Sequence, residues 1–248
     1  NYIVKPDANL ELKGLYSSLK DTEAILKQKV QDLMNSSEFQ SHLQENIYTC
    51  GWEAALRGMR NPMNSWRFSD STFGTNNVSI GPADLALMMR LAKAGTDHRK
   101  YLRMIHIQMD VTAPLYWWKD YDTYKVATTA NGCSTMHKLH AKDLTLDDFS
   151  KEDLDEIGVN ILQTTIDYIN YHRYRFVLDG DKESWRKMIQ ALPTSYNQRR
   201  TLDINYETAL SMIHSRNNHK LQEFRDLCNI LLVECPYLKE IYECVEGK

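Results

Sequence analysis

The sequence of 248 residues has no excess of positive charge. Its 30 lysines and arginines are outnumbered by 33 aspartates and glutamates, which gives a formal net charge of -3. Proteins that bind DNA or RNA hold the phosphate backbone with clustered lysine and arginine. The charge balance therefore argues against a nucleic acid polymer as the main partner.

Cysteines are few, and apolar runs are short. The five cysteines include no CxxC pair, which is typical of reduced thiols in the cytoplasm rather than of a disulfide framework. His137 and His140 have a spacing found in metal sites, but no acidic partner precedes Asp143, so no metal is expected. No stretch reaches the roughly 18 consecutive apolar residues of a membrane-spanning helix, and no signal pattern is present. We expect a cytoplasmic protein that does not bind membranes.

Three common motifs of enzyme sites are also missing, namely GxGxxG, the Walker pattern and GxSxG. Their absence argues against the usual dinucleotide-binding, P-loop and serine hydrolase classes. The content of 42% hydrophobic and 25% charged residues nevertheless suits a globular protein with a real core.

Hydrophobic spacing predicts several elements. Two helices are expected between Leu10 and about Arg60, followed by an ordered loop over 60–82 in which Ser69, Asp70 and Ser71 could act as caps. The remaining predictions are a helix over 82–94, a strand that runs into Pro114, a short aromatic helix over 115–125 and mainly helical structure over 143–195. That last segment has one apolar stripe: Leu154, Ile157, Ile161, Thr165 and Ile169.

The segment RNNHKLQEFR, residues 216–225, combines three basic side chains with an acid. In one straight helix Arg216 and Arg225 would lie on opposite faces, because nine residues rotate the chain by about 900°. The adjacent pair Asn217 and Asn218 instead predicts that one helix ends there and another starts near His219. The free amides of the new helix would then favour an anion such as phosphate.

A simpler alternative for this segment is that its basic residues are exposed and solvated. In that case Glu223 is the i, i+4 partner of His219 on one helix face.

Residues 191–240 read ALPTSYNQRRTLDINYETALSMIHSRNNHKLQEFRDLCNILLVECPYLKE. This stretch resembles the carboxy-terminal block of the flavin-dependent thymidylate synthases, in which LPxSxY and an Asn precede HAQxEIR and a Pro-aromatic pair follows. The matching positions are Leu192, Pro193, Ser195, Tyr196, Asn205, Arg216, His219, Glu223, Phe224, Arg225, Pro236 and Tyr237. Upstream, the order of helix, glycine, strand, Ala-Pro and aromatic helix is similar as well.

The resemblance implies an α+β fold, rich in helices, with a central and mostly antiparallel sheet. It implies one domain over residues 1–248 with a helical amino-terminal extension over about 1–60, assembled as a homotetramer. The implied activity is the reductive C5 methylation of a uracil nucleotide, dUMP to dTMP. FAD would be the cofactor, with NADPH and methylenetetrahydrofolate as co-substrates.

The resemblance also implies roles for individual residues. Arg225 would hold the pyrimidine nucleotide and take part in catalysis, and Arg216 and His219 would lie on the flavin. Two further flavin contacts are expected from Lys125 and Asn131. The remaining nucleotide contacts are expected from Ser134 and from Arg199, or from Gln198 in the other register.

The chain departs from the family at its signature, RHRxxSxNExSxRY, where it reads TYKVATTANGCSTMH over 123–137. With one inserted residue, Thr129, Asn131 and Ser134 match the family's Ser, Asn and Ser, but the RHR triplet becomes Tyr-Lys-Val. Without the insertion, the triplet becomes Thr-Tyr-Lys. Neutral side chains cannot make the bidentate phosphate contacts of arginine. The chain thus resembles a divergent member that lacks the RHR triplet, and the usual mode of holding FAD and dUMP is not expected.

Two questions stay open at this point. The aromatic run over 115–124 could stack on a base or ring, with Lys119 or Lys125 supplying charge, or Trp117 and Trp118 could form aromatic core packing in a subunit interface. Likewise, the chain could be a non-methylating homologue that binds another nucleotide or serves as a structural or regulatory oligomer. An altered reaction on a modified pyrimidine is a third alternative.

Overall fold

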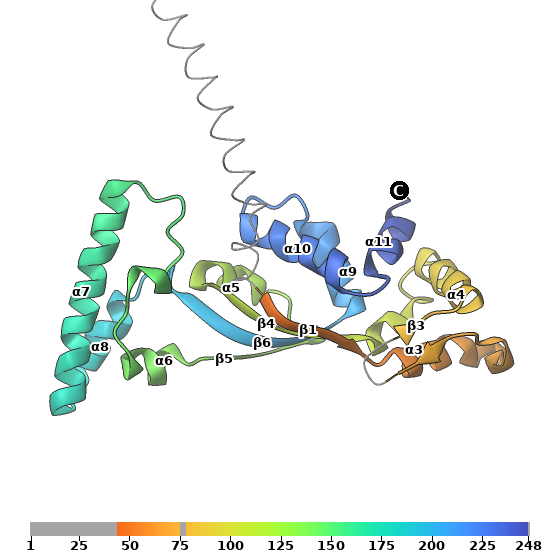
Figure 1. The fold of residues 1–248 in the computed structure, drawn as a ribbon, viewed down its shortest axis with the longest axis horizontal. Coiled ribbons are helices and arrows are strands. Elements are labelled where there is room, and N and C mark those ends of the chain that lie inside the picture. Colours follow the sequence, from red (N-terminus) through yellow and green to blue (C-terminus); the bar gives the residue numbers. More distant parts are fainter. Residues whose placement is uncertain (1–43, 75–77, 248) are drawn as a thin grey trace, which may run out of the picture. The chain divides into compact units, whose positions relative to one another are not determined.

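The computed structural model describes residues 44–74 and 78–247. Figure 1 shows the arrangement of their helices and strands. The strands are β1 (Gln44–Cys50), β2 (Thr72–Phe73), β3 (Val78–Ser79), β4 (His106–Pro114), β5 (Thr128–Gly132) and β6 (Asn197–Asn205). The α-helices are α3 (Trp52–Arg60), α4 (Pro82–Lys93), α5 (Leu115–Tyr121), α6 (Thr135–Lys138), α7 (Glu156–Asp179), α8 (Lys182–Ala191), α9 (Tyr206–Arg216), α10 (Gln222–Glu234) and α11 (Leu238–Glu246). Short 3-10 helices are η1 (Asn61–Met63), η2 (Trp66–Phe68), η3 (Lys100–Met104), η4 (Leu139–Ala141) and η5 (Leu146–Asp148).

The larger sheet is antiparallel, with strand order β1-β4-β6-β5. Strands β4 and β6 pair from His106 opposite Asn205 to Pro114 opposite Asn197. Strand β5 adds to the other side of β6. The expected α+β class with a central antiparallel sheet is therefore confirmed, as is the strand that runs into Pro114.

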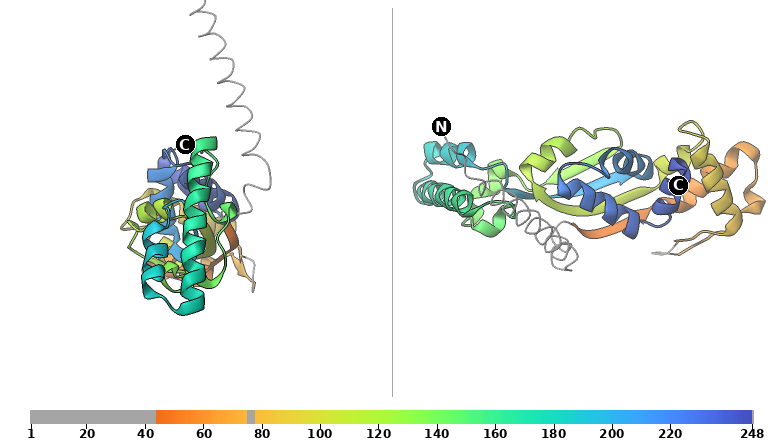
Figure 2. Two further views of the ribbon diagram at one scale, coloured as in Figure 1. Left: turned by 90° about the vertical axis from the view of Figure 1, so that its left-hand side faces the viewer. Right: turned by 90° about the horizontal axis from the view of Figure 1, so that it is seen from above.

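The two faces of this sheet differ in chemistry. Along β4, Ile107, Met109 and Val111 are buried, whereas Gln108 and Asp110 between them are only partly buried. Helices α5, α9 and α10 lie over the apolar face (Figures 1 and 2) and complete the main hydrophobic core. We call the opposite, polar side the open face. The period-two alternation of the sequence thus decides which side of the sheet the helices cover.

The aromatic helix α5 contributes its tryptophans to that core. Trp117 and Trp118 are 0% and 1% exposed, and Trp117 packs against Tyr121 and Phe224 with ring centroids 4.9 Å away in both cases. Both tryptophans are therefore core residues rather than stacking surfaces for a ligand, but the packing lies within one chain and not in a subunit interface as expected.

The loop over 60–82 is organised around one carboxylate. The hydroxyls of Ser69 and Ser71 each donate to Asp84 at 2.7 Å, and the buried Arg60 donates to the same carboxylate. Asp70 accepts hydrogen bonds from the first backbone amides of α4, including the N–H of Asp84 at 3.0 Å. Asp70 is thus a helix cap, as its place in the loop predicted.

The helical prediction for the amino-terminal part is wrong over Gln44–Cys50. These residues form β1, paired antiparallel with β4. Ile47, Tyr48 and Thr49 are β-branched or aromatic residues, which favour strands when one face is partly buried. The helix predicted up to Arg60 is present as α3. The rest of the predicted extension, residues 1–43, lies outside the described residues.

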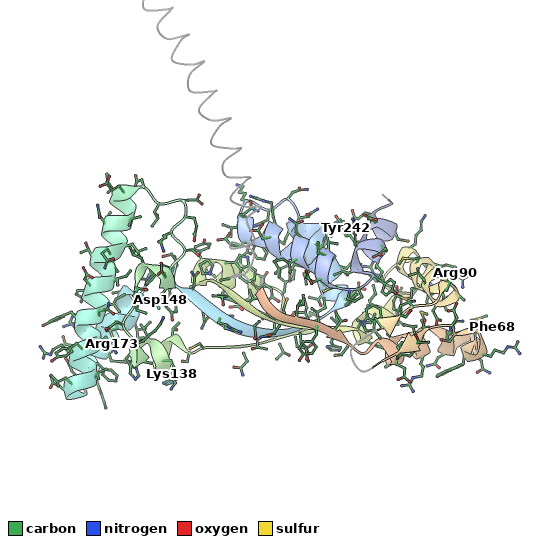
Figure 3. All side chains as sticks on the ribbon, in the orientation of Figure 1. Phe68, Arg90, Lys138, Asp148, Arg173 and Tyr242 are labelled. Atoms are coloured by element: carbon green, nitrogen blue, oxygen red, sulfur yellow. The ribbon has the colours of Figure 1, made fainter. Side chains whose placement is uncertain are left out.

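Helices α7 and α8 enclose a second hydrophobic core. Its members on α7 are Leu162, Ile166 and Ile169, which pack with Met188 of α8. Arg173 of α7, labelled in Figure 3, donates to Asp143 at 2.6 Å from the segment before the helix. Both long-range packing and one charged hydrogen bond therefore hold α7 in place.

Only the last member of the predicted apolar stripe, Ile169, lies on the core-facing side of α7; Leu154, Ile157 and Ile161 are exposed. Ile157 and Ile161 are 69% and 63% exposed, whereas Leu162 and Ile166, one and five positions after Ile161, are buried. The helix carries apolar residues on two sides, and spacing alone does not show which side the chain covers. None of the helices in the described part of the chain has the length and apolar character needed to cross a bilayer.

Candidate functional site

The chain breaks between α9 and α10 at the twin asparagines. The N–H of Asn217 bonds to the carbonyl of Ile213 at 3.0 Å, and the N–H of His219 bonds to the carbonyl of Arg216 at the same distance. Helix α10 begins at Gln222. The predicted break is therefore confirmed, although the second helix starts after His219 rather than at it.

Arg216 at the end of α9 points at helix α5 and the turn that follows it. Its Nη2 lies 3.0 Å from Oδ1 of Asp120, and its Nε donates to the hydroxyl of Tyr124 at 3.0 Å. The guanidinium carbon also lies 4.9 Å from the ring centroid of Phe224. Although burial opposes it, the hydrogen bond to Tyr124 and the charge of Asp120 raise the pKa of Arg216. Arg216 is thus a fixed and permanently charged group.

His219 belongs to the same group of side chains. Its Nδ1 accepts the N–H of Leu221 at 3.2 Å, so its own ring N–H is on Nε2, which lies 3.5 Å from Oδ2 of Asp120. Its ring makes an edge contact with Phe224. We call Asp120, Tyr124, Arg216, His219 and Phe224 the helix-break cluster. One carboxylate in it faces two basic side chains.

Arg225 folds back on the loop that precedes its own helix. Its Nη1 donates to the carbonyls of His219 and Lys220, the latter at 3.2 Å, and its Nε donates to the Gln222 side chain at 3.1 Å. The guanidinium therefore ties the 217–221 loop to α10. Arg225 lies beside the helix-break cluster, on the same side of the sheet.

Glu223 does not pair with His219, as the simpler alternative for this segment required. It accepts a hydrogen bond from the hydroxyl of Tyr116 on α5. Burial and the Glu223 carboxylate both raise the pKa of Tyr116, so its phenol stays protonated and donates. This contact joins the start of α10 to α5 and thereby orients the 217–221 loop that precedes α10.

The open face of the sheet holds a cavity of about 530 Å³. Asn131 lines it from β5, and the cavity is also lined by the following residues: Asn46, Tyr48, Gln108, Met109, Asp110, Thr129, Thr201, Leu202 and Asp203. Next to it, Arg199 donates to Asp110 at 2.9 Å. The cavity is therefore rich in groups that can hydrogen-bond a small polar ligand.

Asp110 is the most strongly perturbed acid of this face. Hydrogen bonds from Thr201, Asn46 and Arg199 lower its pKa to about 2. The folded chain therefore keeps Asp110 ionised at a pH at which the unfolded chain protonates it, so its contribution to stability is lost as pH falls from about 4 to about 2.

We expect Asp110→Asn to remove this acid dependence. In denaturant titrations at pH 6 and pH 3.5, the loss of unfolding free energy between the two pH values should be smaller in the variant than in the unchanged chain. Asp97→Asn, an exposed position, serves as the control and should leave that difference unaltered. An equal loss in both variants would show that Asp110 is not a source of the acid sensitivity.

The predicted site residues fall on two faces of one chain. Arg216, His219 and Arg225 lie with α5, α9 and α10 on the covered side. Arg200 lies on the covered side, where its guanidinium carbon is 4.3 Å from the ring centroid of Trp118. Because neighbouring side chains of a strand point to opposite faces, Arg199 points to the open face, where Asn131 also lies. A single chain therefore does not bring Arg199 and Arg225 together.

The alternative register residue, Gln198, lies on the covered side, two positions from Arg200. It donates through its side-chain amide to the carbonyl of Cys133 at 2.5 Å. Ser134 follows directly and caps α6 by accepting the N–H of His137 at 3.1 Å. Lys125 is exposed and follows Tyr124, which bonds to Arg216.

Sequence reasoning missed Asp120, Tyr116 and Tyr124 as parts of this site. A signal was present, since the three residues are four positions apart and four positions is about one helical turn. Together they form the side of α5 and its following turn that meets Arg216 and Glu223. Their partners lie about a hundred residues away in the sequence, so their role depends on the tertiary fold.

No protein-family model and no curated protein matches this sequence. Solved structures do match the fold. The flavin-dependent thymidylate synthase ThyX from Helicobacter pylori, complexed with FAD and dUMP, matches at a TM-score of 0.59 and 15% sequence identity, over 81% of this chain and 100% of that chain. A second structure of ThyX from the same organism, with FAD and dUMP, matches at 0.59 and 16% over 82% and 99%. The chain therefore has a ThyX-like fold, as the motif order predicted.

Proposed function

We propose that this chain, whose fold is that of the flavin-dependent thymidylate synthases, catalyses the reductive C5 methylation of a uracil nucleotide, of the dUMP to dTMP type. The observation that carries the proposal is the helix-break cluster with Arg225 beside it, where the end of α9 and the start of α10 bring three basic side chains to one side of the sheet. Guanidinium groups at a helix start are suited to a nucleotide phosphate or an anionic ring.

The proposed roles follow the sequence motif. Arg225 would bind the pyrimidine nucleotide and Arg216 and His219 would border the flavin, with NADPH and methylenetetrahydrofolate as the co-substrates. Arg199 and Ser134 would complete the nucleotide site. Because Arg199 and Arg225 lie on opposite faces of one sheet, a complete site needs more than one subunit, and we propose a homotetramer in the cytoplasm.

The residues present can hold FAD only in a mode without the RHR arginines. Lys119, Lys125 and Lys220 are exposed and make no ion pair with a described residue, so they are available to a phosphate. Asn131 would add an amide hydrogen bond from β5. Bound FAD would supply the hydride that completes the methyl group. Lysine binds phosphate as a point charge, so weaker geometric control is expected than with arginine.

A second candidate function is favoured by the same geometry. Arg216 is already neutralised by Asp120, and Arg225 is engaged by carbonyl groups of its own loop. Cations that are fixed by the protein in this way give structural support as well as charge. A non-methylating homologue that binds another nucleotide, or acts as a structural or regulatory oligomer, would retain these contacts.

Absorption spectroscopy of the purified protein tests the proposal. We expect a flavin band in the isolated protein or after addition of FAD, a shift of that band when dUMP is added, and rescue of growth in a host that requires thymidine. Protein that acquires no flavin band and does not rescue growth would refute the methylation. Nucleotide binding without flavin would instead support the second candidate.

Replacement of the competing carboxylate gives a specific prediction. Asp120→Asn removes the negative charge that faces Arg216 and His219, so an anionic ligand at Arg216 should bind about five- to tenfold more tightly, which corresponds to ~1 kcal/mol for a partly exposed pair. Isothermal titration with FAD and with dUMP measures the change. Asp122→Asn, on the same helix end but paired with Arg200, is the matched control. Weaker binding in Asp120→Asn alone would mean that Asp120 itself contacts the ligand.

A further inference from the structure

The register of the sheet places four side chains in one row across the open face. Tyr48 of β1 lies opposite Gln108 of β4. Asp203 of β6 lies opposite Gln108 on one side and opposite Thr129 of β5 on the other. Residues that are opposite each other on antiparallel strands point to the same face, and all four line the cavity of the open face. We call them the Asp203 row.

Asp203 is held in place but keeps acceptor positions for a ligand. Its Oδ1 lies 2.7 Å from Nδ1 of His106, and its Oδ2 accepts the side-chain amide of Gln108 at 2.7 Å. Although burial opposes them, these two contacts lower the pKa of the carboxyl, so Asp203 is ionised at neutral pH. An ionised carboxylate has about four lone-pair positions. Within the described part of the chain the others are left open, and the side chain is 33% exposed.

A second row of polar side chains lies two residues further along the strands. Asp110, Thr201 and Asn131 are opposite one another there. Thr201, Asn46 and Arg199 all donate to Asp110, which leaves it little capacity for a ligand. The side-chain amide of Asn131, by contrast, makes no hydrogen bond to a described residue. Two residues of a strand span about 7 Å, so one small ligand can contact both rows.

The charges of the cavity restrict the class of ligand. Each carboxylate already faces a basic side chain, His106 for Asp203 and Arg199 for Asp110, so a further cation is not required. A phosphate between the two rows would be repelled by both carboxylates. The other lining groups include hydroxyls and amides, which donate as well as accept. A neutral ligand rich in hydroxyl groups therefore fits this lining better than an ammonium group, which can only donate.

We propose that this cavity binds the ribose of a ribonucleoside, with its 2′- and 3′-hydroxyls on Asp203. A carboxylate that accepts a ribose hydroxyl is a common contact in dinucleotide-binding proteins. The exposed ring of Tyr48, at one end of the Asp203 row, packs on the apolar side of the ligand. The amide of Asn131, in the second row, meets the edge of the base. The cavity volume of about 530 Å³ is in the range of pockets for such ligands.

This site is separate from the one proposed at the helix-break cluster. It lies on the open face, needs no flavin and takes a ribose, whereas dUMP carries a deoxyribose without the 2′-hydroxyl. Two sources of ribose share this chemistry, namely a free ribonucleoside and the adenosine part of a larger nucleotide.

A series of nucleosides tests the proposal on the unchanged chain, by calorimetric titration without flavin. Adenosine should bind, and 2′-deoxyadenosine and 3′-deoxyadenosine should each bind about tenfold more weakly, because each has lost one of the two hydroxyls. Adenosine that binds more tightly than ADP-ribose would identify the free nucleoside as the ligand. The reverse order would identify the adenosine part of a larger nucleotide.

Asp203→Asn gives the matching test on the protein. Asparagine keeps the shape but has one acceptor oxygen instead of two, so the preference for adenosine over 2′-deoxyadenosine should fall from about tenfold to less than threefold. Tyr48→Ala, at an exposed position, should weaken both nucleosides and leave that preference unchanged. Asp122→Asn, on the covered side, is the control and should alter neither. Because the readout is a ratio, partial loss of folded protein does not imitate it.

Three results would overturn the proposal: no adenosine binding at millimolar concentration, equal affinity for adenosine and 2′-deoxyadenosine, or an unchanged preference in Asp203→Asn. The outcome is independent of the methylation. A chain that binds adenosine but acquires no flavin band would support this site and refute the enzyme, and a yellow chain without affinity for adenosine would do the reverse.

Discussion

Replacement of Asp84 by asparagine is expected to lower the free energy of unfolding by about 3–5 kcal/mol, the usual cost of removing one member of a buried ion pair. Asp84 is fully buried, and its Oδ2 accepts four hydrogen bonds from Ser69, Asp70 and Ser71. Its Oδ1 accepts from Arg60. An amide NH₂ group in either place would face donors only, and Arg60, 5% exposed, would keep a buried charge without its partner.

Denaturant unfolding at neutral pH measures this loss, and Asp97→Asn is the control for a surface aspartate. Burial alone would raise the pKa of Asp84, but hydrogen bonds from Ser71, Ser69 and Arg60 outweigh it and hold the pKa below its ordinary value. The contribution of Asp84 is therefore present at neutral pH and falls away in acid. A loss below 1 kcal/mol would mean that the 60–82 loop does not depend on this carboxylate.

Arg216→Gln should have the largest effect on ligand binding, a loss of affinity for the flavin or nucleotide of about 30-fold or more. Truncation of a desolvated, hydrogen-bonded charge at an interface typically costs 2–5 kcal/mol. Arg216 is held by Asp120 and Tyr124 and is mostly buried, so no other cation takes its position. The substitution also leaves Asp120 with His219 as its remaining partner.

Titration with FAD and with dUMP, each followed by calorimetry, gives the affinities. Arg90→Gln on α4 is an exposed arginine far from the cluster in sequence and serves as the control (Figure 3). A thermal melt of Arg216→Gln separates loss of the site from loss of the fold. Unchanged affinity in a folded variant would remove Arg216 from the proposed site and leave it a purely structural role.

The sequence predicted those elements whose signals are local. Helix α4 has its proline at the start and glycine after its end, and β4 has strict alternation of buried and polar residues. The break after Arg216 follows from two adjacent asparagines. In the loop over 60–82, Asp70 caps α4, one of the roles that the capping residues indicated. In each case a few neighbouring residues are sufficient to decide the local conformation.

Other elements depend on partners distant in sequence. β1 was read as helix because its pairing with β4 cannot be seen from residues 44–50 alone. β6 was not predicted, since the alternation within NQRRTLDIN places arginines on both faces, where Arg200 packs on a tryptophan. For α7, two apolar sides compete, and only the position of α8 decides between them.

The candidate site was predicted in its basic residues but not in its acid. Arg216, His219 and Arg225 do come together, as the helix break implied. Asp120 lies between two of them and changes the balance of charge. Asp120 is on a helix about a hundred residues away in the sequence, so the 216–225 segment itself contains no sign of it. A sequence motif therefore predicts the basic residues of such a site but not its net charge.

The division of the sheet into two faces also affects how binding responds to dilution. If one nucleotide contacts Arg225 above the sheet and Arg199 below it, the two groups belong to different chains. Ligand release then accompanies separation of the chains, so occupancy at a fixed ligand concentration falls as the protein is diluted. Two chains, one defective at each arginine, would restore a complete pocket between them when mixed.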